Sequence, residues 1–485
     1  MSKFRPLSEY RKGAANGYQL LPLRFTRLDE QRYVLTNFTG EYHVVTGSLL
    51  YDFVQHRLPH DAQAYDDLKA KHFLIDSNSS GAIDLLALKT RTRYERLANF
   101  TALHMFVVTL RCEHSCPYCQ VSRQNDDQSQ FDMTEETADR ALDHVFRSPS
   151  PNIMIEFQGG EPLLNFPLIE HIVHGAIERN HRARRELGFV IATNLALVTD
   201  DMLRFCDVHS IHISTSLDGP RDLHNKNRPR AGGDSYERAV QGIARTRETL
   251  GCDNISAMMT TTAASLGRAR EIVDEYVSNG FRGIFFRPLS PYGFAVKTKG
   301  FAAYDSDQWL PFYFEGLDYI IELNRRGVQF LEFYAAVILQ KMLTPFQPGY
   351  VDLMSPAGIG LGALVYNYDG KVYASDESRM LGEMHDDTFC LGTVYDSYEE
   401  LMLSDKLLEP LEGSFSGSVP MCVTCAFEPY CGSDPVYHHA TQHDFVGRKP
   451  ASDFCRRKMA IFRGLIARME EDAYIRELFT QWANR

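Results

Sequence analysis

The sequence predicts an α/β protein built on a partial, TIM-like (β/α)6 barrel with a smaller domain at each end. Strands and helices alternate over residues 105–291, which is the pattern of parallel βαβ units. Short alternating strands precede this region, and a group of four cysteines follows it. At 485 residues the chain is also longer than a single core usually serves, so several domains are expected.

Charge and hydropathy exclude two classes of partner. The formal net charge is −12 and no basic block is present, which argues against a nucleic-acid partner. Residues 1–6 open no apolar signal segment, and no apolar run has the length of a membrane span. We therefore expect a cytoplasmic protein that binds neither nucleic acid nor membrane.

Residues 1–80 are predicted to form a separate domain. Alternating apolar positions predict strands at 23–28, 32–36 and 41–45, and helical spacing follows over 49–68. A sheet edge of this kind offers unpaired N–H and C=O groups to an extended peptide, so the domain is a candidate peptide-binding unit. An inert structural extension is the alternative. A polar linker and a bridging helical segment, residues 81–104, lead to the barrel.

The barrel region is predicted over residues 105–345. Its strands are expected at 105–110, 153–157, 189–193, 211–216, 255–260 and 283–288. Capping patterns at Asp132 and Asp234 predict helix starts, and two further helices follow over 308–325 and 330–343. Because ligand sites lie at the carboxyl ends of parallel strands, the residues that follow each strand are the candidate site.

Three cysteines follow the first strand at the spacing C-x3-C-x2-C, namely Cys112, Cys116 and Cys119. Three thiolates can hold three corners of a cubane iron–sulfur cluster and leave the fourth iron open to a ligand. A structural zinc, with His104 or His114 as the fourth ligand, is the alternative.

After the second strand comes Gly159-Gly160-Glu161-Pro162. The glycines would let a ligand approach the main chain, and the carboxylate of Glu161 suits a cation. A simple turn is the alternative.

The carboxy-terminal domain is predicted over residues 346–485. Asp369-Gly370 between two apolar runs predicts a β-hairpin. The second cysteine group, Cys422, Cys425, Cys431 and Cys455, supplies four thiolates for either a closed iron–sulfur cluster or a structural zinc. The remaining cysteines, Cys206, Cys252 and Cys390, are interpreted as small hydrophobic residues.

The cysteine loop and the GGEP motif together resemble the radical S-adenosylmethionine (radical SAM) superfamily. In that family the open iron of a [4Fe–4S] cluster chelates the amino and carboxylate groups of SAM. The resemblance implies that Tyr118 lies beside the adenine, that Glu161 contacts the ammonium and that Arg228 pairs with the carboxylate; a solvated loop arginine is the alternative for Arg228. The implied SAM-binding residues are Tyr118, Gly159, Gly160, Glu161, Asn194, Ser216, Arg228 and Leu289.

The two ends of the chain resemble further modules of radical SAM peptide maturases. The amino-terminal pattern is similar to the winged-helix-like, PqqD-like element that holds a leader peptide. The second cysteine group resembles a SPASM domain, which usually carries two auxiliary [4Fe–4S] clusters. Ser375 and Pro435 stand where ligands of one of these clusters are expected. The resemblance therefore implies one auxiliary [4Fe–4S] cluster, closed by the four cysteines, that carries electrons.

Residues 107–120, 376–383 and 429–435 are similar to the His-Xaa-Ser-system radical SAM maturases of the HxsB type. The resemblance implies a flavodoxin or ferredoxin reductant, a ribosomally made precursor peptide and a second radical SAM protein as partners. It also implies that a 5′-deoxyadenosyl radical takes hydrogen from a side-chain carbon, giving a crosslink or an oxidation. Asp376, Glu377 and Asp434 are candidate bases, and surface carboxylates are the alternative.

Two other functions stay open on the sequence. One is a sulfatase-type maturase that generates formylglycine. The other is a non-catalytic Fe–S peptide-binding partner of a second radical SAM enzyme, which the complete cysteine motif opposes.

Overall fold

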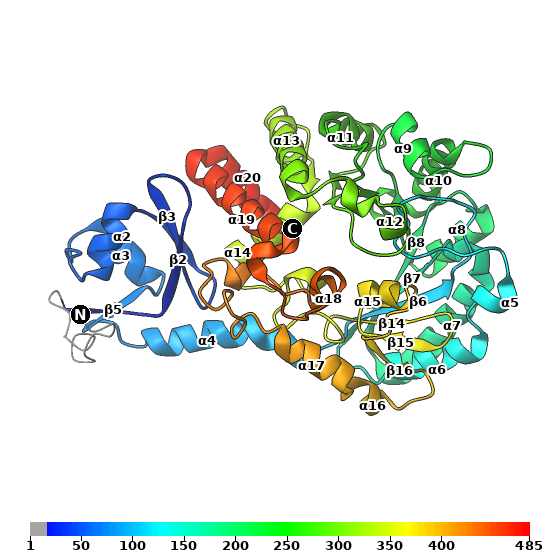
Figure 1. Cartoon of the computed structure of the whole chain (residues 1–485), viewed down its shortest axis with the longest axis horizontal. Helices are drawn as coiled ribbons and strands as arrows, with labels where there is room; N and C mark the ends of the chain where they lie inside the picture. Colours follow the sequence, from blue (N-terminus) through cyan, green and yellow to red (C-terminus); the bar gives the residue numbers. More distant parts are fainter. Residues whose placement is uncertain (1–16) are drawn as a thin grey trace.

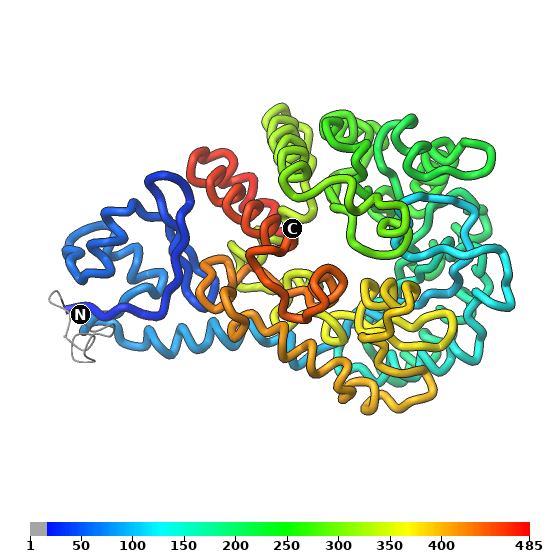
Figure 2. The backbone as a smooth tube through the Cα atoms, in the orientation of Figure 1, coloured from blue at the N-terminus to red at the C-terminus, as the bar shows by residue number. Residues whose placement is uncertain are grey.

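The computed structural model describes residues 17–485, and the amino-terminal stretch in which we expect no targeting signal lies outside them. A small amino-terminal unit occupies one end of the molecule and a large α/β unit the other, with the last helices between them (Figures 1 and 2). No helix in the described part of the chain combines the length and apolar character needed to cross a membrane.

The amino-terminal unit is a three-stranded antiparallel sheet with two helices on one face. Its elements are β1 (Tyr18–Leu20), β2 (Leu23–Arg27), β3 (Arg32–Asn37), β4 (Tyr42–Thr46), α2 (Gly47–Val54), α3 (Gln63–Ala70) and β5 (Leu74–Asp76). The sheet order is β2-β3-β4, and buried Leu35, Phe53 and Leu68 form its separate core. The pairing of β1 with β5 was not predicted, and it extends the unit into the expected linker because Tyr65 and Lys69 both bind the carboxylate of Asp76.

The bridging helix α4 (Ala82–Tyr94) runs from the amino-terminal unit along the molecule (Figure 1). Gly81 precedes it with φ +76°, a left-handed conformation that glycine adopts without strain.

The main sheet has nine strands in the order β12-β10-β9-β8-β7-β6-β14-β15-β16. Six of its neighbouring parallel strands come from the predicted barrel region: β6 (Leu103–Thr109), β7 (Asn152–Gly159), β8 (Glu186–Thr193), β9 (His212–Ser216), β10 (Ile255–Thr260) and β12 (Phe286–Arg287). The predicted α/β fold with a largely parallel sheet is confirmed. Because these neighbours run the same way, their carboxyl ends meet at one edge of the sheet.

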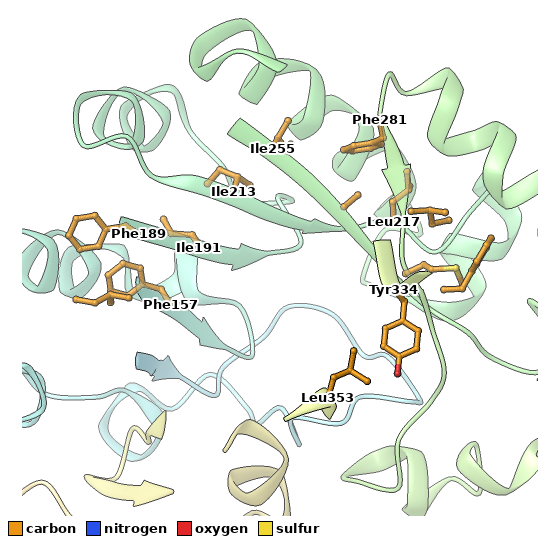
Figure 3. Close-up of a cluster of buried hydrophobic side chains, with 14 of the residues drawn as sticks. Phe157, Phe189, Ile191, Ile213, Leu217, Ile255, Phe281, Tyr334 and Leu353 are labelled. Atoms are coloured by element: carbon orange, nitrogen blue, oxygen red, sulfur yellow. The ribbon is translucent and has the colours of Figure 1, made fainter. Parts of the chain in front are cut away.

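Helices lie over the outer face of this sheet and over the cysteine loop at its carboxyl edge. They are α5 (Gln128–Phe131), α6 (Glu135–Val145), α7 (Phe166–Ala183), α8 (Asp200–Val208), α9 (Arg221–Asn227), α10 (Ser235–Leu250), α11 (Ala269–Ser278), α12 (Phe294–Lys297), α13 (Ser306–Arg325) and α14 (Phe333–Leu343). The two that lie over the cysteine loop are α5 and α12. Phe157, Ile191 and Ile213 project from neighbouring strands into the buried apolar cluster of Figure 3.

Two local predictions in the barrel are wrong. The strand expected at 283–288 is split: β11 (Gly283–Ile284) pairs with β13 (Leu331–Glu332), while β12 pairs with β10. The buried carboxylate of Glu332 accepts a hydrogen bond from the Phe286 N–H. This N–H is therefore not used for hydrogen bonding between strands. Helix α6 is capped by Thr134, not Asp132, because the Asp132 carboxylate binds Arg111.

The predicted hairpin forms, but it belongs to the main sheet. Strand β14 (Ala363–Tyr366) lies parallel to β6, and β15 (Lys371–Tyr373) and β16 (Cys390–Thr393) continue the sheet antiparallel. The remaining helices are α15 (Asp376–Gly382), α16 (Tyr398–Met402), α17 (Asp405–Gly413), α18 (Pro435–Gln442), α19 (Asp453–Glu471) and α20 (Ala473–Ala483).

Candidate cofactor and substrate site

The loop that carries the first three cysteines leaves β6 and is fixed at both ends. Arg111 donates to both carboxylate oxygens of Asp132, at 2.7 and 2.8 Å, and to the carbonyl of Leu164. Farther along, the Ser115 N–H donates to the carbonyl of Pro229 at 2.7 Å. The loop therefore holds its thiols over the sheet edge before any ligand binds.

These thiols line a cavity of about 250 Å³, here called the cysteine-loop cavity. Residues from the carboxyl ends of successive strands complete it: Gln158, Gly159, Gly160, Thr193, Asn194, Ser216, Thr260 and Arg287. The structure thus brings Cys112, Cys116 and Cys119 together with six of the eight predicted SAM-binding residues: Tyr118, Gly159, Gly160, Asn194, Ser216 and Arg228.

The spacing of the sulfurs fits a multi-iron cluster better than zinc. A tetrahedral zinc site places its sulfurs about 3.8 Å apart. Among residues 17–485, only Cys112, Glu113 and His114 offer three ligand atoms within 4.8 Å of one another, so at least one pair of the three cysteine sulfurs is farther apart than 4.8 Å. His104 does not line the cavity, and its Nδ1 lies 3.1 Å from the hydroxyl of Tyr366.

The thiols also need a cation to become ligands. Burial raises the pKa of Cys116 to about 12, and burial together with the Glu113 carboxylate raises the pKa of Cys112 still further. Metal ions deprotonate thiols that bind them, so iron would supply the missing positive charge. The buried Thr215 hydroxyl, which lines the same cavity, has no hydrogen-bond partner in the described part of the chain. The donor set and this free hydroxyl both fit a bound polar cofactor.

Tyr118, Asp218 and Arg228 form a buried polar group on the cavity wall. The Tyr118 hydroxyl donates to the Asp218 carboxylate at 2.5 Å, and Arg228 Nε lies 3.1 Å from the same oxygen. The Arg228 guanidinium carbon lies 5.6 Å from the centre of the Tyr118 ring. Arg228 is therefore not a solvated loop arginine. The sequence analysis did not single out Asp218, although it directly follows the strand 211–216.

Glu161 is placed differently from the prediction. It is fully buried behind the cavity and does not line it. Its carboxylate accepts hydrogen bonds from the Thr193 hydroxyl at 2.5 Å, the Asn194 N–H at 2.9 Å and the Leu163 N–H at 3.1 Å. Burial and the Glu113 carboxylate raise the pKa of Glu161 to about 8. Glu161 thus joins the ends of β7 and β8 because three donors converge on it.

The two glycines before Glu161 are needed for packing as well as for ligand access. A Cβ atom on Gly160 would lie 2.3 Å from the carbonyl oxygen of Arg111. The motif is therefore a close contact between two strand ends, and not a simple turn. Leu289 does not line the cavity either; it packs against Tyr118 and Ala295.

The three candidate bases lie at two neighbouring cavities. Asp376 lines the cysteine-loop cavity. Glu377 and Asp434 line a smaller cavity of about 70 Å³, here called the acidic chamber, which also contains Asp352. Arg287 lines both cavities. The surface alternative is wrong for Glu377 and Asp434, since burial raises their pKa values to about 7 and about 8.

The second cysteine group also lines one cavity of about 250 Å³, here called the auxiliary site, with mainly apolar walls. Among the described residues, no three of its sulfurs lie within 4.8 Å of one another, as at the first site. Burial raises the pKa of Cys422 to about 11. Ser375 and Pro435 do not line this cavity; Ser375 caps α15, and Pro435 is the first residue of α18.

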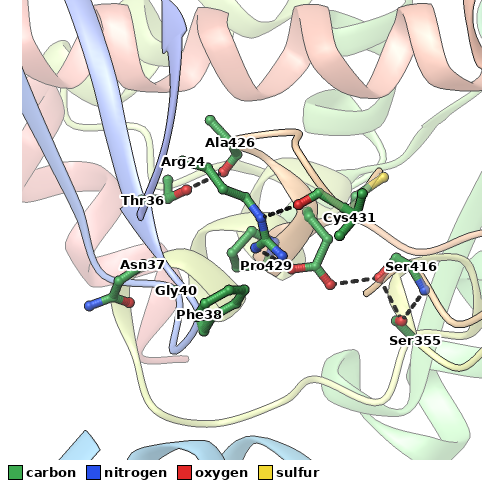
Figure 4. Close-up of polar contacts among 12 residues, drawn as sticks. Arg24, Thr36, Asn37, Phe38, Gly40, Ser355, Ser416, Ala426, Pro429 and Cys431 are labelled. Carbon is green, nitrogen blue, oxygen red and sulfur yellow. Dashed lines mark hydrogen bonds and ion pairs between the residues drawn. The ribbon is translucent and has the colours of Figure 1, made fainter. Parts of the chain in front are cut away.

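The amino-terminal sheet packs directly on the auxiliary site (Figure 4). Arg24 on β2 donates to the Val423 carbonyl at 2.7 Å and pairs with the Glu428 carboxylate at 2.8 Å. Its cross-strand neighbour Thr36 donates to the Ala426 carbonyl. All three partners lie between the cysteines 422 and 431, so the amino-terminal unit is part of the wall around this loop.

The central part of the chain is similar to a known protein family. Residues 106–282 match the model of the Radical SAM superfamily. A relative from Methanothermobacter thermautotrophicus is 32% identical over 185 residues, which are 37% of this chain and 65% of that protein. The chain thus spans just under two thirds of this relative's length.

Relatives with named activities match at lower identity. The radical SAM cyclopropyl synthase TigE of Paramaledivibacter caminithermalis is 22% identical over 231 residues, covering 44% of this chain and 45% of TigE. The cysteine-type anaerobic sulfatase-maturating enzyme of Clostridium perfringens is 21% identical over 322 residues, covering 63% and 80%.

Solved structures share the fold. The structure of anSMEcpe with bound AdoMet and Kp18Cys peptide matches with a TM-score of 0.63 at 18% identity, covering 79% of this chain and 98% of that one. Streptococcus suis SuiB bound to its precursor peptide SuiA matches with a TM-score of 0.52 at 13% identity, covering 90% and 100%.

Proposed function

We propose that this chain, a radical SAM enzyme, modifies a ribosomally made precursor peptide at an unactivated side-chain carbon. The single observation that carries the proposal is the junction of the cysteine-loop cavity with the acidic chamber at Arg287. When bound, the [4Fe–4S] cluster and SAM would supply an electron and a 5′-deoxyadenosyl radical. The product would be a crosslink or an oxidised residue.

The chain's own residues would hold and orient these cofactors. Cys112, Cys116 and Cys119 would bind the cluster, with the wide sulfur spacing and buried thiols in support. Around the cavity, Tyr118, Asn194, Ser216 and Arg228 would contact SAM together with the main chain of the two glycines. Glu161 and Asp218 would keep these groups in place, since each is buried and bound by several donors.

Among the candidate bases, Asp376 is the best placed to accept a proton when the substrate is oxidised. It is the one of the three that lines the cysteine-loop cavity, where the radical would form. Arg379 donates to its carboxylate at 3.0 Å and would fix its orientation. Glu377 and Asp434 face the neighbouring chamber instead.

The amino-terminal unit would bind the leader of the precursor, as a winged-helix-like, PqqD-like domain. One face of its sheet packs on α2 and α3 and the other on the auxiliary site, which leaves the edges of β2 and β4 for an extended peptide. Phe25 on β2 is 52% exposed and offers an apolar contact there.

The auxiliary site would hold one [4Fe–4S] cluster in a SPASM-like domain and accept the electron left by oxidation. Its sulfur spacing supports a cluster over zinc for the same reason as at the first site. A flavodoxin or ferredoxin would reduce the enzyme, and a second radical SAM protein would act beside it.

Metal content and SAM cleavage test this proposal. Anaerobically reconstituted protein should contain about eight irons per chain and the variant Cys112→Ala/Cys116→Ala/Cys119→Ala about four. Only the former should release 5′-deoxyadenosine under reducing conditions. About four irons with zinc retained would make the auxiliary site structural, and no 5′-deoxyadenosine from the wild type would favour a non-catalytic peptide-binding partner.

Formylglycine formation in a sulfatase is the second candidate, because the relative from Clostridium perfringens is covered over 80% of its length. Mass spectrometry separates the two. A sulfatase-derived peptide should stay unmodified while a precursor peptide changes mass; the reverse result would make formylglycine formation the function.

A further inference from the structure

The acidic chamber is lined by both carboxylates and cationic side chains, few of which are paired with one another. It lies between the barrel segment 285–292, the start of α15, the start of α18 and helix α19. Three carboxylates line it, from Asp352, Glu377 and Asp434. In residues 17–485 the Asp352 carboxylate has no hydrogen bond or ion pair, and the nearest cation to Glu377 is Arg287 at 3.9 Å.

Two buried hydroxyls in the same chamber lack partners. Tyr292 is 1% exposed and Tyr334 is 8% exposed, and both side chains line the chamber. Within the described residues neither hydroxyl has a hydrogen-bond partner. Buried polar groups are almost always satisfied, so these two hydroxyls are available to hydrogen-bond with a ligand in the chamber.

The other two cations that line the chamber, Arg457 and Lys458, form no ion pair with its carboxylates within the described residues. Burial raises the pKa of Asp352, and the charges of Arg287 and Arg457 partly oppose this rise. Lys458 lies over the rings of Tyr334 and Phe454, at 4.5 and 4.9 Å from their centres, and makes no ion pair in the described structure. Burial lowers the pKa of Lys458 to about 7, which weakens its positive charge at neutral pH. Arg457 donates to the Ser306 hydroxyl and stacks on Tyr437.

The carboxylates of the chamber raise one another's pKa values in addition to the effect of burial. The pKa of Asp434 is raised to about 8 by burial and then by Asp352 and Glu377. The walls are otherwise aromatic, with Phe285, Trp309 and Tyr350 among them. Acceptors set among aromatic faces are the surroundings that ammonium and guanidinium groups prefer.

We propose that the acidic chamber binds a positively charged side chain of the substrate peptide, and so places a neighbouring residue in the cysteine-loop cavity. This inference rests on the proposed function for the identity of the ligand. A bound cation stabilises the ionised carboxylates of Glu377 and Asp434, whose protons pass to solvent. The hydroxyls of Tyr292 and Tyr334 add hydrogen bonds to the adjoining main chain of the peptide.

The built-in reporter for this site is Trp309, one of only two tryptophans in the chain. Full-length protein reconstituted anaerobically and labelled with 5-fluorotryptophan should give two ¹⁹F signals, assigned with Trp482→Phe. Titration with n-butylammonium at constant ionic strength should shift the Trp309 signal saturably and leave that of Trp482 unchanged. The neutral analogue n-butanol should not shift it.

Charge-neutral variants make the test specific. Glu377→Gln and Asp434→Asn should each weaken n-butylammonium binding at least tenfold, while Glu412→Gln, an exposed carboxylate on α17, should not. Asparagine at 434 can still cap α18, so the helix start is preserved. No shift of the Trp309 signal, or equal binding by n-butanol or by the variants, overturns the proposal. The titration needs no SAM cleavage, so its failure is distinguishable from failure of the proposed function.

Discussion

Replacing Arg24 with methionine removes the charge that joins the amino-terminal sheet to the auxiliary site and keeps most of the side-chain volume. The Glu428 carboxylate would then be buried without its closest cation. Removing one partner of a buried ion pair typically lowers the stability by about 3–5 kcal/mol. Because Glu428 keeps the Ser416 hydroxyl at 2.7 Å and Arg93 at 3.7 Å, we expect the lower end, about 3 kcal/mol.

Hydrogen exchange measured by mass spectrometry would detect this loss. The amino-terminal unit has its own core, so it can open without global unfolding. About 3 kcal/mol corresponds to about 100-fold faster exchange in peptides that contain β2 and β3, where exchange is limited by opening. Peptides from α7 and β7 should keep their rates.

The matched control is Arg27→Met on the same strand. Arg27 is exposed and donates only to the carbonyls of Asp29 and Glu30, so its loss should cost within about 0.5 kcal/mol. In the double variant Arg24→Met/Glu428→Gln, part of the protection should return, because the buried carboxylate is gone and Arg93 keeps its hydrogen bonds to the carbonyls of Phe38 and Pro429. Equal exchange in Arg24→Met and Arg27→Met would refute the reasoning.

Three further outcomes follow from the site. Asp376→Asn should still release 5′-deoxyadenosine but yield little oxidised or crosslinked peptide; normal product formation, measured by mass spectrometry, would remove Asp376 as the base. Glu161→Gln should lower the thermal midpoint as well as SAM affinity, because the N–H groups of Leu163 and Asn194 donate to different oxygens of Glu161 and the amide NH2 must face one of them, at a cost of about 1–3 kcal/mol. An unchanged midpoint would leave Glu161 with a purely ligand-binding role. Lys458→Met should be more stable than wild type near pH 7, and the difference should shrink as the pH rises toward 10. The pKa of Lys458 is about 7 in the folded state and near 10.5 in the unfolded state. Between these pH values the unfolded state binds more protons, so the stability of the wild type rises with pH by at most about 1.4 kcal/mol per pH unit. Chemical denaturation at pH 7, 8 and 9 measures the free energy of unfolding of both proteins. The same pH dependence in wild type and Lys458→Met would contradict this prediction.

Much of the fold was predictable because its signals are local. The β-branched runs at 105–110 and 153–157 specify strands through periodicity alone, and the glycines at 159 and 160 mark a place where two strand ends meet closely. The spacing of Cys112, Cys116 and Cys119 limits the metals that the loop can bind. These patterns need only a few neighbouring residues, so the sequence by itself determined them.

Other features were decided only by the tertiary structure, because they depend on residues that are distant in sequence. Arg24 and Glu428 are 404 residues apart, and Tyr118 and Asp218 are 100 apart. The same motif glutamate, Glu161, could face a ligand or a strand end, and its three donors set it behind the cavity. Asp352, Glu377 and Asp434 share a chamber because β14 adds to β6 and carries α15 and α18 over the barrel. Burial and charge at such places are properties of the assembled layers, since each depends on which surfaces meet and exclude water.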